Sequence, residues 1–233
     1  MGKKIEAVKK VQELFRVATR GLAFRAYVND YEEVKLNNPY DESAITFVKF
    51  GDIIYSGKSL FFRSGKLDYD PDRIRHLARL MATVGLNVIC INNVNVHFPG
   101  QLLLEDYLPD LAKLADLFRP FGVRLMLSID FSQPMRHGIP TADPLDPQVQ
   151  EWWRECAGRV WAAVPDLAGF LVKADSENRP GPFSYGRNHA EGANMLADAV
   201  RPYGGIVIWR CFVYNCRQDW RDTQTDRPKA AFE

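Results

Sequence analysis

Two apolar stretches, VRLMLSIDF at residues 123–131 and LAGFLVKADSE at residues 167–177, flank the longer stretch DPQVQEWWRECAGRVWAAVP at residues 146–165. The two short stretches are rich in aliphatic and β-branched residues and predict buried strands, whereas the longer one has the spacing of an amphipathic helix. A strand, a helix and a strand in this order indicate a βαβ unit, in which the two strands run parallel.

The same alternation extends along most of the chain. Helices are predicted over residues 70–85, 104–122 and 188–205, and further strands over residues 86–96 and 206–214. The predicted strands lack a clean polar–apolar alternation, as expected when helices or side chains cover both faces of a sheet. We therefore predict an α/β fold, which is either an open doubly wound sheet or a (β/α)8 barrel.

The motifs that follow the strands favour the barrel. No GxGxxG or Walker sequence follows any predicted strand, which argues against a nucleotide-binding sheet. Four clear strand–helix units are visible, so we expect an incomplete TIM-type barrel, with about the first half to five-eighths of the eight units. We assign residues 55–233 to this partial barrel. Residues 1–54, which include a predicted helix over residues 5–20, form an atypical N-terminal segment of unclear origin.

The composition limits the classes of protein to which this chain can belong. The 233 residues carry a net charge of +1, so no strong basic field predicts binding to nucleic acid or to an anionic membrane surface. The four cysteines form no CxxC pair and predict buried free thiols rather than disulfides or a zinc site. No secretory signal and no apolar stretch of about 18 residues is visible, so we expect a soluble cytoplasmic protein.

Charged side chains stand where the predicted strands end. Lys173, Asp175 and Glu177 follow at every second position, and Arg210 interrupts the apolar strand IVIWRCFVY. A buried lysine is costly unless it is paired, so Lys173 either pairs with an acid or forms part of an anion site. Two cations at equivalent places on neighbouring strands indicate a shared anionic ligand, which Arg210 can hold bidentately. Glu177 is either a general acid with a raised pKa or a solvated loop residue.

Asparagine and tryptophan side chains also point to a sugar. INNVNV at residues 91–96 places the Asn93 and Asn95 amides on one face, where they can bind sugar hydroxyls, although asparagine is also common in turns. Trp209, directly before Arg210, fits either a wall on which a sugar stacks or the hydrophobic core.

Four long strings carry a resemblance to a known family: INNVNVH, ADPLDPQVQEWW, GFLVKADSENRPGPFSYGR and HAEGANMLADAVRPYGGIVIWRCFVYNCRQDWRDTQTDR. They resemble the catalytic barrel of the glycoside hydrolase family 67 α-glucuronidases over about residues 55–233. The resemblance implies a (β/α)8 barrel that removes 4-O-methyl-glucuronic acid from glucuronic-acid-decorated xylo-oligosaccharides with inversion. It implies that Glu177 is the general acid and that Lys173 and Arg210 bind the uronate carboxylate.

We add Asn93, Asp175 and Tyr214 to the residues that we expect to bind substrate. No metal or organic cofactor is implied, since hydrolysis by acid–base chemistry needs only positioned carboxyl groups.

The chain also departs from the family pattern. An inverting glycosidase needs a second carboxylate about 6.5–9.5 Å from the acid, and the family's acidic pair would follow Glu233. We therefore expect a truncated chain that is weakly active or inactive. The alternatives are a non-catalytic module that binds uronates or sugars, and a domain that functions as a homo-oligomer or together with a separate C-terminal half.

Overall fold

The computed structural model describes residues 60–63, 66–92, 94, 96, 100–175 and 180–210, together with the backbone of residues 25–27. The strands are β1 (Arg25–Tyr27), β2 (Phe62–Arg63), β3 (Lys66–Leu67), β4 (Val88–Cys90), β5 (Arg124–Asp130), β6 (Gly169–Lys173) and β7 (Ile206–Trp209). The α-helices are α2 (Pro71–Thr83), α3 (Leu108–Phe118), α4 (Pro147–Ala163) and α5 (His189–Val200). Short 3₁₀ turns span Gly100–Leu104, Arg119–Phe121, Gln133–His137, Pro182–Tyr185 and Arg201–Tyr203.

All four strand–helix units that the sequence predicts are confirmed. Three of the four described α-helices begin where a side chain caps their free amides: Asp70 accepts from the amides of Asp72 and Arg73 at the start of α2, and Asp146 accepts from those of Gln148 and Val149 at the start of α4. Helix α5 begins with a reciprocal capping box between Asn188 and Glu191. The exception is α3, which begins after Tyr107 without a side-chain cap.

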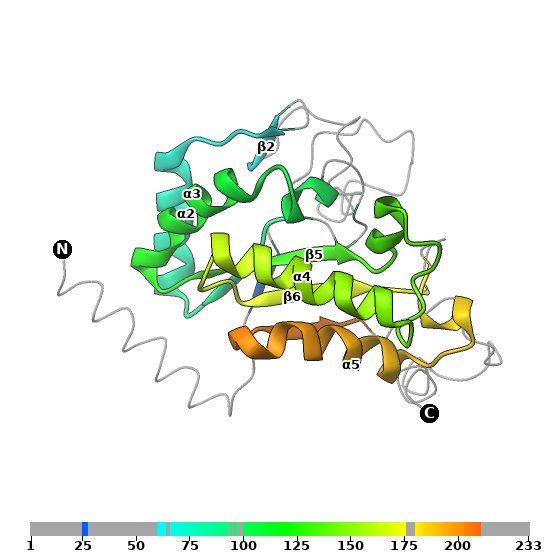
Figure 1. The fold of residues 1–233 in the computed structure, drawn as a ribbon. Coiled ribbons are helices and arrows are strands. Elements are labelled where there is room, and N and C mark those ends of the chain that lie inside the picture. Colours follow the sequence, from blue (N-terminus) through cyan, green and yellow to red (C-terminus); the bar gives the residue numbers. More distant parts are fainter. Residues whose placement is uncertain are drawn as a thin grey trace, which may run out of the picture.

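The sheet is parallel and its strands lie in chain order, β1-β4-β5-β6-β7 (Figure 1). Every neighbouring pair is parallel, as the βαβ reading predicts. Within the described residues the order never reverses, whereas a doubly wound sheet has a reversal at its switch point. Strand β1 is not predicted by the sequence pattern, yet Arg25 pairs with Val88 and Tyr27 with Cys90. The predicted helix over residues 5–20 lies outside the described residues, and the division at residue 54 stays a prediction.

The helices form one layer on one face of the sheet. Helix α2 packs against α3, α3 against α4, and α4 against α5, and Figure 1 shows α4 in front of β6 with α5 beside it, next to β7. Leu127, Ile129, Phe170 and Val172 point into the large core between these helices and the sheet. The alternate residues of the strands form a second, smaller cluster on the opposite face: Val88, Cys90, Met126, Ala168 and Leu171. Both faces of the sheet are therefore apolar in their middle, which explains the uninterrupted apolar stretches of the sequence.

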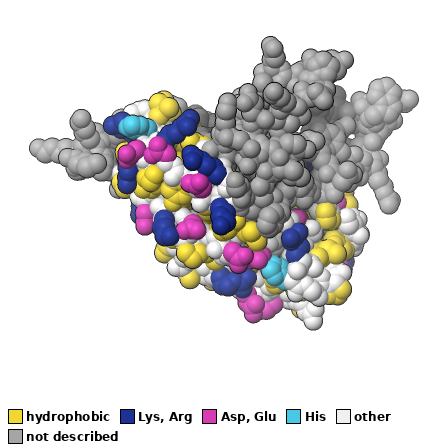
Figure 2. All heavy atoms as spheres, turned by 90° about the horizontal axis from the view of Figure 1, so that it is seen from above, with side chains coloured by type: hydrophobic (Ala, Val, Ile, Leu, Met, Phe, Trp, Pro, Cys, Tyr) yellow, Lys and Arg dark blue, Asp and Glu magenta, His cyan; other side chains and the backbone are white. Residues whose placement is uncertain are grey.

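The described surface carries charges of both signs. In Figure 2 basic and acidic side chains alternate over the visible described face, in keeping with a net charge of +1. Among the described helices none has the length and apolar composition that crossing a membrane requires. Cys90 and Cys156 are buried free thiols, as predicted, and Cys211 and Cys216 lie outside the described residues.

Candidate active site

Three charged residues lie in one row across neighbouring strands, on the sheet face opposite the helices. Asp130, the last residue of β5, pairs in register with Lys173, the last residue of β6. Trp209 pairs with Val172, and the amide of Arg210 donates to the Val172 carbonyl at 3.0 Å, so Arg210 comes next in the same row. The carboxyl ends of three parallel strands thus present one acid and two cations side by side.

Asp130 is held firmly in this row. Its Oδ1 accepts from the amide of Ser132 at 3.0 Å and from the Ser132 hydroxyl at 2.8 Å, and its Oδ2 accepts from Gln101 Nε2 at 3.0 Å. Asp130 and Lys173 are 8% and 3% exposed, so both charges are removed from bulk water. A buried cation needs a nearby anion, and the register places the Asp130 carboxylate on the strand next to Lys173.

Asp175 leaves this row. Strand β6 ends at Lys173, and Asp175 has φ of 49°, a left-handed conformation that is uncommon for residues other than glycine. Its Oδ2 accepts from the Phe183 amide at 3.0 Å. Gly181 packs so closely that a Cβ there would lie 2.4 Å from the same oxygen, so only glycine fits at this position. The period of two that the sequence suggests for residues 173–177 therefore ends at Lys173.

The Asp175 carboxylate lies against His189, and His189 in turn contacts Trp209. The first residue of α5, His189, is fully buried, and its Nε2 lies 3.1 Å from Asp175 Oδ2, although its N–H is poorly aligned for a full hydrogen bond. Trp209 Nε1 donates to His189 Nδ1 at 2.7 Å. The indole also meets Phe131 edge-on and packs against the core beneath the helices. Of the two roles that the sequence left open for Trp209, the structure shows the core one.

A polar cluster lies one level below the charged row. Asn92 Nδ2 donates to the Ser128 carbonyl and Asn92 Oδ1 accepts from the Ser128 amide, both at 2.9 Å. The Asn92 side chain thus extends the β4–β5 ladder beyond Cys90. Cys90 Sγ lies 3.2 Å from Ser128 Oγ. These contacts fix the end of β4, from which the predicted sugar-binding Asn93 follows directly.

An ion pair joins the loop that follows β6 to the loop that precedes α4. Arg187 Nε and Nη2 donate to Asp143 Oδ1 and Oδ2, each at 3.0 Å. This bidentate contact lowers the pKa of the Asp143 carboxyl below its ordinary value. Both residues lie within the strings that carry the family resemblance, so the pair explains part of that sequence pattern.

Comparison with known proteins decides the family. The family model of the glycosyl hydrolase family 67 middle domain matches residues 22–233. The chain belongs to glycosyl hydrolase family 67. It is 44% identical over 91% of its length to the α-glucuronidase of Hypocrea jecorina, and 39% identical over 94% to α-glucuronidase A of Aspergillus tubingensis. It covers 25% and 26% of those relatives, so this family 67 chain spans about a quarter of their length.

The structure describes only part of the site that was predicted for this family 67 chain. It brings Lys173 and Arg210 together in one row and turns Asp175 toward α5. Glu177, Asn93 and Tyr214 lie outside the described residues, so their roles stay predictions, as does substrate binding by Asp175. Among the described residues no cluster of histidine, cysteine, aspartate or glutamate is suited to hold a metal ion.

Sequence reasoning missed two residues that shape this part of the family 67 fold. Asp130 was visible as a polar residue at a strand end, but only the strand register places it beside Lys173. His189 follows a helix-capping asparagine, a position that usually faces solvent, and no local signal marks it as buried.

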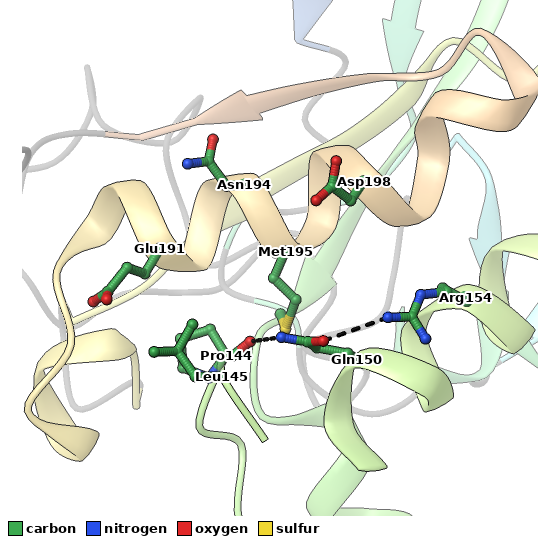
Figure 3. Close-up of a pocket in the computed structure, with 8 residues that line it drawn as sticks. All are labelled: Pro144, Leu145, Gln150, Arg154, Glu191, Asn194, Met195 and Asp198. Carbon is green, nitrogen blue, oxygen red and sulfur yellow. Dashed lines mark hydrogen bonds between the residues drawn. The ribbon is translucent and has the colours of Figure 1, made fainter. Parts of the chain in front are cut away.

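A pocket of about 200 Å³ lies elsewhere, between α4, α5 and the loop at Pro144 (Figure 3). Two of its polar side chains already have partners: Gln150 Nε2 donates to the Pro144 carbonyl at 2.9 Å, and Glu191 accepts from the amide of the capping residue Asn188 at 2.8 Å. It lies on the helix side of the sheet, away from Lys173 and Arg210. We therefore place the candidate active site at the charged row and not in this pocket.

Proposed function

We propose that the chain carries part of the (β/α)8 catalytic barrel of an α-glucuronidase, which hydrolyses terminal (4-O-methyl-)glucuronic acid from xylo-oligosaccharides with inversion. Membership of family 67 and the names of the relatives support this reaction. The chain-order parallel sheet, with its helices in one layer, supports a barrel, because successive βα units that wind in one direction lead to closure.

The observation that carries the proposal is the row of Asp130, Lys173 and Arg210. One carboxylate, one ammonium and one guanidinium thus lie side by side at the carboxyl ends of the strands. Two cations on neighbouring strands can bind the carboxylate of a ligand, the guanidinium bidentately and the ammonium as a point charge, whereas a neutral sugar offers them no negative charge. A uronic acid is the sugar class that offers such a carboxylate.

The proposed chemistry needs two further groups. Glu177, four residues after Lys173, would donate a proton to the oxygen of the leaving xylo-oligosaccharide. A second carboxylate would activate a water molecule on the other face of the sugar. Lys173 and Arg210 would hold the uronate carboxylate, so that the glycosidic oxygen is presented to the acid.

Binding can be measured separately from turnover. We would titrate D-glucuronate and D-glucose into the chain by calorimetry, and we expect a clear preference for glucuronate. Lys173→Met removes one buried cation and should weaken glucuronate binding at least about thirtyfold. Lys113→Met is the matched control, because Lys113 is exposed on α3 and pairs only with Asp110 among the described contacts. Equal affinity for the two sugars would contradict the proposal.

Turnover tests the assignment of Glu177. The assay measures release of 4-O-methyl-glucuronic acid from a short aldouronic acid by the wild-type chain and by Glu177→Gln. We expect any release to disappear in the variant, because glutamine cannot donate the proton. Release that persists in Glu177→Gln would show that another group is the acid. Binding of glucuronate without release in either protein would favour a binding module.

A further inference from the structure

Three buried or partly buried side chains connect the strands that carry the two cations. Asp175 comes two residues after Lys173, and Trp209 comes directly before Arg210. His189 lies between them: its Nδ1 accepts from the Trp209 indole at 2.7 Å, and its Nε2 lies 3.1 Å from Asp175 Oδ2. The contact thus runs from the end of β6, through the first residue of α5, to the end of β7.

The hydrogen-bond partners define the state of the imidazole. An indole N–H can only donate, so His189 Nδ1 must be the acceptor and carries no proton. The proton of the neutral ring is then on Nε2, which faces the Asp175 carboxylate. The hydrogen bond from Trp209 therefore requires one tautomer of the neutral ring, and its Nε2 proton lies within contact distance of the Asp175 carboxylate although it is poorly aligned for a full hydrogen bond.

The surroundings leave the three side chains little freedom. The left-handed backbone of Asp175 is costly for a residue with a side chain, and it is held by the Phe183 amide and by the close approach of Gly181. At the Trp209 end of these three side chains, a Cβ at Gly192 would lie 2.8 Å from Trp209 Cη2. Two glycines thus make room for this arrangement, one at each end.

We propose that Asp175, His189 and Trp209 are positioning residues that set the spacing of Lys173 and Arg210, and hence the fit of a uronate carboxylate between the two cations. Asp175 and His189 are 2% and 0% exposed and act through their neighbours. This role differs from the substrate contact that the sequence suggested for Asp175, which stays a separate prediction. The inference rests on the proposed function, since it concerns the same uronate site.

Trp209→Phe tests the inference because it removes the indole N–H and keeps an aromatic ring. The measured quantity is the ratio of D-glucuronate affinity to D-glucose affinity, by calorimetry. We expect this ratio to fall about tenfold, since small displacements of positioned charges carry large penalties. A loss of stability alone would lower the melting temperature without changing this preference for the carboxylate.

Trp161→Phe is the matched control. Within the described residues Trp161 Nε1 has no hydrogen-bond partner, and the ring stacks on Tyr203 near the start of β7, far along the strand from Arg210. The same substitution there should leave the ratio unchanged. Gly192→Ala is the second variant, in case Trp209→Phe does not fold. Its new methyl group displaces the indole without removing it, and Gly158→Ala in α4 is its control.

The possible outcomes separate the two proposals. A lower ratio in Trp209→Phe or Gly192→Ala, with both controls unchanged, supports positioning. If the wild type prefers glucuronate and neither variant alters the ratio, the positioning role is wrong and the proposed function stands. If the wild type shows no preference, the proposed function is wrong and this inference falls with it. Independently, a ¹⁵N spectrum that places the His189 proton on Nδ1 would refute the hydrogen bond from Trp209 to His189 and with it the positioning role.

Discussion

Replacing Gly192 by alanine should destabilise the protein, even though alanine is the better helix residue. Gly192 lies within α5, where the substitution gains about 1 kcal/mol of helix propensity. The added Cβ, however, would lie 2.6 Å from Pro182 Cγ and 2.8 Å from Trp209 Cη2. Both atoms belong to rigid rings, so the structure must shift, at a typical cost of about 1–3 kcal/mol for overpacking.

Gly158 in α4 separates packing from propensity. Its Cβ would meet only the hydroxyl of Tyr203, at 3.3 Å, and that side chain is 42% exposed and can move aside. Gly158→Ala should therefore keep the propensity gain of about 1 kcal/mol. Because the gain is common to both variants, the difference between them isolates the overpacking and should be about 1–3 kcal/mol.

Urea denaturation followed by tryptophan fluorescence measures this difference. For a slope of about 2 kcal/mol per molar urea, the midpoint of Gly192→Ala should lie roughly 0.5–1.5 M below that of Gly158→Ala. Equal midpoints with equal slopes would refute the reasoning, because the close approach of α5 to Trp209 would then cost nothing to disturb.

Three further predictions concern stability and reactivity. Asp70→Ala removes the cap of two α2 amides and should lower the free energy of unfolding by about 1 kcal/mol, measured by the urea midpoint. Arg187 lowers the pKa of Asp143, so this pair stabilises the fold above the ordinary carboxyl pKa of about 3.9 and the contribution is lost as the pH falls through the lower folded value. Asp143→Asn should consequently lose less stability than the wild type on acidification below about pH 4, and an equal loss in urea melts would contradict this. Burial raises the pKa of the Cys156 thiol to about 12, so iodoacetamide at neutral pH should label it only after unfolding, as read by mass spectrometry.

The sequence predicted the elements of this fold well where each was long enough to show its period. The four helices and the strands β4–β7 follow from apolar spacing, from Asp and Asn caps, and from uninterrupted apolar stretches. Strand β1 was missed because Arg25, Ala26 and Tyr27 form no apolar run like that of β4, and only its pairing with β4 identifies it. Strand order was likewise left open, since apolar spacing alone does not tell which strands are neighbours.

The sequence revealed those site residues whose charged side chains would be costly to bury in an apolar strand. Lys173 and Arg210 stood out because each interrupts an apolar strand, and the structure places them in one row. Asp130 needed the register, and Asp175 was misplaced in the pattern because the backbone turns left-handed two residues after β6 ends. His189 was hidden, since its burial depends on contacts with Asp175 and Trp209, which are distant from it in the sequence.

The chain-order sheet has a consequence for how the protein is made. Each of the strands β5–β7 pairs with the strand before it in the chain, from which one α-helix and about forty residues separate it. A ribosome needs roughly 2–8 s to synthesise such a segment, whereas local helix and strand contacts form in far less time. When each of these strands emerges, its partner has already been synthesised, so the sheet can grow by one unit at a time during translation.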